Sequence, residues 1–136
     1  MGYNLYNTRR ENWIDEDDSN SISLNEWINY IKTDDEMRLD NFAEATATNG
    51  EYVRVETAGM SVWTKYSKDG VAGNHAWFWP DSGNIVVKNP DAEIRNKMID
   101  IAGQLNAKVQ GDDGETYNFK ESVEARRPWW KVWSKN

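Results

Sequence analysis

The 136-residue sequence contains no cysteine, a single histidine and only three prolines. The absence of cysteine excludes disulfide bonds, thiolate nucleophiles and cysteine-ligated zinc or iron–sulfur sites. No segment approaches the roughly 18 consecutive apolar residues that a membrane-spanning helix requires. The N-terminal stretch MGYNLYNTRRENW also lacks the apolar centre of a secretory signal. We therefore expect a cytoplasmic protein with no transmembrane segment.

The charge balance is acidic, with 23 acidic against 16 basic side chains, a net charge of −7 and a pI near 4.7. Such a surface repels phosphates, so nucleic-acid binding is not expected. It attracts basic proteins and accelerates encounters with them, although the simpler interpretation is solubility alone. Aromatic residues make up 12% of the chain, which indicates a packed core within one domain.

Two segments carry the signals of amphipathic helices. The first follows Ser23, which with Glu26 forms a capping box. Its apolar residues repeat at helical spacing, at Leu24, Trp27, Ile28 and Ile31. The second helix is expected to begin with Asn89 as its cap and Pro90 in its first turn. Its expected buried stripe is Ile94, Met98, Ile101 and Leu105.

The remaining periodic segments predict strands. The first covers residues 2–7, and four more are EYVRVET, MSVWTKY, HAWFWP and NIVVK, between residues 51 and 88. We expect the first two of these four to form a hairpin around Ala58-Gly59, and the other two to form a hairpin around PDSG. AKVQ and ETYNF flank GDDG as a final hairpin, whereas residues 34–50 are predicted to be a loop.

This order of elements predicts an α+β fold. We expect a single domain over residues 1–125, with a mainly antiparallel meander sheet and two amphipathic helices packed on one face. The other face of the sheet then needs an explanation. The period of two in HAWFWP places His75, Trp77 and Trp79 on one side, where we expect Trp63 of a neighbouring strand to join them. These rings form either a binding surface, where tryptophan is enriched, or part of the core.

Catalytic signatures are absent from the sequence. It contains no nucleophile elbow, zinc-protease, phosphate-loop or dinucleotide-binding motif. His75 is the one side chain whose ordinary pKa lies near neutrality, and a lone histidine beside tryptophans is more often structural. We therefore expect a protein without enzymatic activity and without a cofactor. An enzyme that uses His75 with a carboxylate is the alternative.

A calcium loop is a second possibility that the sequence raises. The segment DEDDSNSISLNE has oxygen-bearing side chains at the spacing of EF-hand ligands. These residues are Asp15, Asp17, Ser19, Ser21, Ser23 and Glu26. Asn20 replaces the usual glycine, no helix is predicted to enter the loop, and the capping box already accounts for Ser23 and Glu26. A solvated acidic loop is the favoured interpretation, and calcium binding is the alternative.

The last segment, RRPWWKVWSKN at residues 126–136, differs from the rest of the chain because it is cationic and rich in tryptophan. Its candidate binding residues are Arg126, Arg127, Trp129, Trp130 and Trp133. We expect this tail to fold back over the aromatic sheet face, with its cations near acidic loops. Binding to a partner, with Trp and Arg as anchors, and binding to an anionic membrane surface are the alternatives.

Several stretches together resemble a family of small bacterial proteins to which no activity is assigned. They include YNLYNTRRENW, ISLNEWINYIKTDDEMRLD, VWTKY and GNIVVKNPDAEIRNKMIDIAGQLNAKVQGDDGETY. The resemblance implies no role for any residue, but the size and acidity are similar to those of immunity proteins that neutralise bacterial toxins. The hypothesis is a non-catalytic acidic domain that binds a basic protein. A small-molecule or calcium-binding protein is the alternative.

Overall fold

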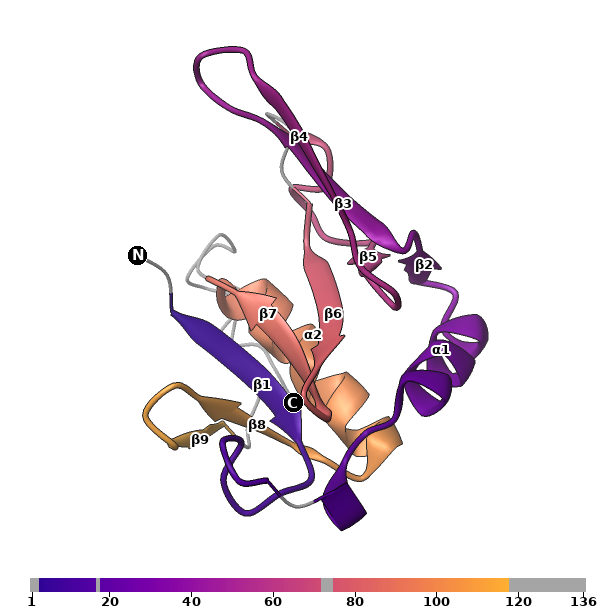
Figure 1. Cartoon of the computed structure of the whole chain (residues 1–136), viewed down its shortest axis with the longest axis vertical. Helices are drawn as coiled ribbons and strands as arrows, with labels where there is room; N and C mark the ends of the chain where they lie inside the picture. Colours follow the sequence, from indigo (N-terminus) through magenta and orange to yellow (C-terminus); the bar gives the residue numbers. More distant parts are fainter. Residues whose placement is uncertain (1–2, 17, 72–74, 118–136) are drawn as a thin grey trace, which may run out of the picture.

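The computed structural model describes residues 3–16, 18–71 and 75–117. It is a single α+β domain built on an antiparallel seven-stranded sheet with two helices, as the sequence predicts (Figure 1). The sheet has the order β2-β5-β6-β7-β1-β8-β9. Its strands are β1 (Asn4–Thr8), β2 (Met37–Leu39), β5 (Ser61–Trp63), β6 (Trp77–Asp81), β7 (Asn84–Lys88), β8 (Lys108–Gly111) and β9 (Thr116–Tyr117).

The two helices begin at side-chain caps. Helix α1 (Leu24–Thr33) follows Ser23, whose hydroxyl accepts a hydrogen bond of 3.1 Å from the backbone N–H of Glu26. Helix α2 (Ala92–Leu105) follows Asp91, whose carboxylate accepts one of 2.9 Å from Ile94. The predicted cap Asn89 lies two residues too early. It adopts a left-handed φ of 52° and its side chain accepts a hydrogen bond from Tyr3 instead.

The core lies between the helices and one face of the sheet. Trp27 of α1 and Met98 of α2 are fully buried and belong to one hydrophobic cluster with the sheet residues Leu5, Phe78 and Ile85. The predicted stripe of α2 is buried over its whole length, whereas Leu24 of α1 is exposed. Within the described residues, neither helix is long and apolar enough to cross a membrane.

The strand pairings confirm two predicted hairpins and correct a third. Strands β6 and β7 pair around the predicted turn, and β8 pairs with β9. The loop predicted over residues 34–50 is wrong, because β2 and a further strand, β3 (Phe42–Thr46), lie within it. Strand β4 (Tyr52–Glu56) pairs with β3 and not with β5. Since β2 and β6 occupy both edges of β5, no edge of β5 is left for β4.

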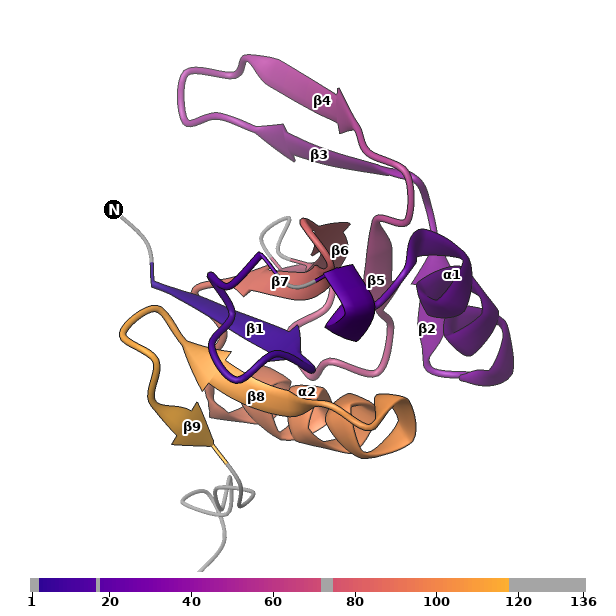
Figure 2. The same cartoon turned by 60° about the horizontal axis from the view of Figure 1, so that its bottom comes forward.

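Strands β3 and β4 form a separate two-stranded sheet, which we call the β3–β4 hairpin. It projects from the domain near β2 and β5 and overhangs the face of the large sheet that is opposite α2 (Figure 2). All five residues of β4 are exposed, whereas four of the five residues of β7 are buried. The β3–β4 hairpin therefore stands apart from the hydrophobic core.

Candidate functional site

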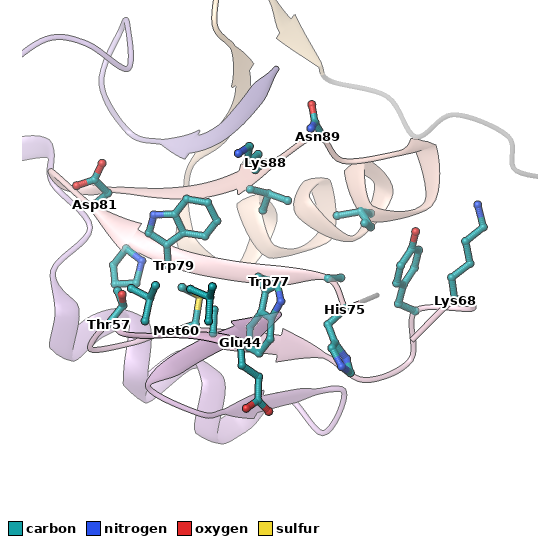
Figure 3. A pocket seen from close by; sticks show the side chains of 18 residues that line it. Glu44, Thr57, Met60, Lys68, His75, Trp77, Trp79, Asp81, Lys88 and Asn89 are labelled. Atoms are coloured by element: carbon teal, nitrogen blue, oxygen red, sulfur yellow. The ribbon is translucent and has the colours of Figure 1, made fainter. Parts of the chain in front are cut away.

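An open cleft of about 980 Å³ lies between the β3–β4 hairpin and the outer face of β6 and β7. We call the outer face the side of the large sheet that points away from α2. Ala43, Val53 and Val55 contribute the hairpin wall. Trp77 and Trp79, which are labelled in Figure 3, line the sheet wall. Two largely apolar β surfaces thus line one open space, and apolar walls with a few polar groups are common in binding sites.

Hydrogen bonds at the base of the hairpin hold this cleft open. The backbone N–H of Thr57 donates to the carbonyl of Asn41 at 3.0 Å, and the Asn41 side chain accepts from Gly59 at 2.9 Å. The indole of Trp27 donates to the Gly59 carbonyl at 2.8 Å. Gly59 has a φ of +86°, and a Cβ at this position would lie 2.6 Å from the Pro80 side chain. Only glycine fits there, so the chain leaves the hairpin at a fixed point.

The two tryptophans of the sheet wall owe their position to the alternation of β6. Phe78 points into the core and is 0% exposed, so Trp77 and Trp79 point to the outer face and are half-buried. Trp79 pairs across the sheet with Val86. The Trp77 ring lies 6.5 Å from the ring of Phe42 at the start of the hairpin. This contact joins the two walls at one end and leaves the remaining apolar surface accessible.

Trp63 does not belong to this face, so the predicted grouping with Trp77 and Trp79 is wrong. The register of β5 and β6 pairs Trp77 with Val62, which places Trp63 on the opposite face. Trp63 is 8% exposed, belongs to the core cluster and donates a hydrogen bond of 3.0 Å to Glu36. The core interpretation therefore applies to Trp63, whereas Trp77 and Trp79 are half-buried on the outer face.

His75 lies at the end of the cleft, where its Nδ1 is 2.9 Å from the Asp69 carboxylate. Its ring meets Trp77 edge-on at 5.5 Å. A carboxylate that orients an imidazole provides two of the three members of a catalytic triad. Among the described residues, however, no hydroxyl forms a hydrogen bond to the imidazole, and both side chains of the pair are more than a quarter exposed. The pair therefore orients His75 without presenting a nucleophile from the described part of the chain.

Positively charged, negatively charged and neutral polar side chains surround the apolar walls. Lys68, Lys88, Glu44 and Asp81 line the cleft together with Tyr66. The Tyr66 hydroxyl donates to Asp91 at 2.7 Å, and burial together with this hydrogen bond raises the pKa of Tyr66 to about 12. The phenol is therefore neutral at physiological pH. The cleft can satisfy polar groups of a ligand at its edge while its centre stays apolar.

Two of the candidate calcium ligands, Glu26 and Ser21, bind arginine side chains in the structure. Arg9 forms a bidentate ion pair with Glu26, with a distance of 2.9 Å from Nη1 to Oε1. This pair holds the pKa of Glu26 below its ordinary value. Arg10 donates to the Ser21 hydroxyl at 2.8 Å, and Asp17 lies outside the described residues. Over the described ranges, no group of three or more His, Cys, Asp or Glu side chains is placed to hold a metal ion.

The tail candidates and one strand of the hairpin differ in how far the structure tests their prediction. Residues 126–136, including every candidate in RRPWWKVWSKN, lie outside the described residues, so their docking stays a prediction. Strand β4 was predicted, but its partner β3 was missed because residues 34–50 lack a strong apolar pattern. The alternating valines of YVRVE were the available signal, since Val53 and Val55 necessarily share one face of a strand.

Comparisons with known proteins add no family to this description. Family models, curated proteins and solved structures were each searched with the chain, and no match was found. The family resemblance of the sequence thus stays a prediction.

Proposed function

We propose that this protein binds a segment of another protein in the cleft beneath the β3–β4 hairpin and that it catalyses no reaction. The cleft itself is the observation that supports this most directly. Val53 and Val55 are 48% and 53% exposed, and they line the same space as Trp77 and Trp79. Burial of such apolar surface contributes about 25 cal/mol per Å², and tryptophan is a frequent anchor of protein interfaces.

The partner that the charges favour is basic. The net charge of −7 attracts a basic protein over long range and accelerates its association. This combination of an acidic surface and an aromatic cleft supports an immunity-type role, in which the domain covers the basic surface of a toxin. Co-purification of the full chain with the product of a neighbouring toxin gene tests this role. Toxin activity that is unaffected by the domain would reject it.

A selection of displayed random peptides on the immobilised full chain tests the cleft itself. We expect the selected peptides to combine basic with apolar or aromatic residues. Trp79→Ala should weaken them at least tenfold, which corresponds to about 1.4 kcal/mol. Trp13→Ala is the matched control, because Trp13 is another half-buried tryptophan that stacks on Tyr6 outside the cleft. If both variants lose the same peptide affinity, or if neither loses any, the cleft is not the binding site.

A small apolar ligand is the second candidate, because the cleft volume of about 980 Å³ falls within the range of ligand pockets. Titration of the full chain with a panel of aromatic and aliphatic ligands, followed by tryptophan fluorescence, separates the two candidates. A saturable change with one ligand, abolished by Trp79→Ala while no peptide is selected, would favour this alternative. A turnover of any panel compound that disappears in His75→Ala would instead indicate an enzyme.

A further inference from the structure

The outer edge of β4, which is five residues long, has no partner strand within the part of the chain that the structure describes. Strand β4 pairs with β3 on one side only, through five residue pairs from Phe42↔Glu56 to Thr46↔Tyr52. Within the described residues no strand pairs with its other edge. Figure 2 shows β4 on the side of the hairpin that is farther from β6 and β7. Its five residues are all exposed, which leaves their outward backbone groups accessible.

Natural edge strands are usually protected by short length, proline, bulges or lysine. The edges of the large sheet follow this rule, since β2 has three residues and the described part of β9 has two. Strand β4 has the sequence YVRVE, with no proline, no lysine and three residues of high β-propensity. Its one cation, Arg54, is engaged by Glu56 at 2.7 Å and by the Phe42 ring at 3.9 Å. This edge is therefore open to pairing.

The marginal stability expected for an isolated two-stranded hairpin also favours the addition of a third strand. A two-stranded hairpin without a covered face is at best marginally stable in water. The hairpin is fixed at its base, but Val53 and Val55 on its cleft side remain about half exposed. An added strand would extend the small sheet and place its own apolar side chains on the same side as these valines.

The charges of the hairpin distinguish between the possible occupants. Residues 42–56 contain three acidic side chains, Glu44, Glu51 and Glu56, and one basic side chain, Arg54. A second copy of this chain would bring the same excess of negative charge, on top of a net charge of −7 for each molecule. Like charges opposite each other destabilise strand pairs, and opposite charges stabilise them. A basic strand is therefore the better fit.

We propose that β4 accepts an extended segment of the partner as a third strand, and that this segment alternates apolar and basic side chains. The apolar side chains lie on the same side as Val53 and Val55 and point toward the cleft. The basic side chains lie on the side of Glu44 and Glu56, a face that borders the cleft only through Glu44. This inference rests on the proposed function and specifies the partner by its pattern, since backbone pairing gives affinity and alternation gives specificity.

Amide hydrogen exchange of the full chain with a capped peptide of alternating lysine and valine tests this proposal. We expect the peptide to slow exchange of amides within residues 52–56. The same peptide with N-methyl groups along one edge carries an equal charge but cannot pair through that edge. We expect it to bind at least tenfold more weakly, because several backbone hydrogen bonds are lost. A peptide with glutamate in place of lysine should show no binding.

Three results that differ from this expectation would each contradict a defined part of the proposal. If the N-methylated peptide binds equally well, the attraction is only electrostatic and strand addition is wrong. If β4 amides are protected without peptide, the edge is already filled, by a second copy where sedimentation shows a dimer and by the chain itself where it shows a monomer. If Trp79→Ala abolishes binding of the selected peptides but exchange at residues 52–56 never changes, the cleft binds its partner without β4. The proposed function would then survive while this inference fails.

Discussion

Strands β7 and β4 have similar sequences but very different surroundings. NIVVK and YVRVE both contain two β-branched valines within five residues, yet β7 has four buried residues and β4 has none. Strand β7 lies between β6 and β1, and its Ile85 and Val87 belong to the core that α2 covers. Among the described residues, strand β4 pairs only with β3, and its five residues are all exposed. We infer that the large sheet is built for stability and the hairpin for binding.

Loss of a core ring should give the largest effect. Phe78 is 0% exposed at the centre of the hydrophobic cluster. Phe78→Ala removes buried surface and leaves a cavity, so we expect a loss of about 3–5 kcal/mol of unfolding free energy in urea. A loss below about 1 kcal/mol would mean that the large sheet is as loosely packed as the hairpin, and the contrast between the two regions would disappear.

A buried ion pair should give the next largest effect. The Lys97 ammonium is 2.9 Å from Asp34 and 3.1 Å from Glu36, and the Lys97 and Asp34 side chains are 7% and 11% exposed. Hydrogen bonds from the Trp63 indole and from Lys97 hold the pKa of Glu36 below its ordinary value. Lys97→Ala leaves the Asp34 carboxylate buried without its cation, so we expect a loss of roughly 3 kcal/mol in the same assay.

The matched control for Lys97 is the ion pair of the hairpin. Arg54 and Glu56 are 2.7 Å apart, but their side chains are 44% and 72% exposed. Solvent and salt screen such a pair, so Arg54→Ala should leave the unfolding free energy unchanged within error. Equal losses in the two variants would show that burial does not set the strength of these pairs.

A conservative change of one valine in each region should give the smallest and most specific difference. Val87→Thr places a hydroxyl at a position that is 2% exposed, and we expect it to cost about 1–3 kcal/mol. Val53→Thr, at 48% exposure, should change the unfolding free energy by no more than about 0.5 kcal/mol. The hairpin variant should instead reduce peptide affinity. A greater loss of stability in Val53→Thr would indicate that the cleft is already filled within the folded chain.

Local patterns were sufficient to predict much of the fold. The Ser23 cap, the four-residue stripe of α2 and the turn between β6 and β7 depend on residues close together in the sequence. The fold class follows from the order of such elements. The helix-face position of Trp63 could not be predicted, because it depends on the register between β5 and β6, and a shift of one residue moves a side chain to the other face.

The sequence by itself determined that this protein is an acidic, cysteine-free α+β domain in which β6 carries two tryptophans on one side. Only the tertiary structure decided that β4 leaves β5 to pair with β3, and that the resulting hairpin overhangs those tryptophans. The reason is that strand pairing is a competition between distant segments. Both edges of β5 are taken by β2 and β6, and the bonds of Asn41 and Gly59 then fix where the hairpin stands.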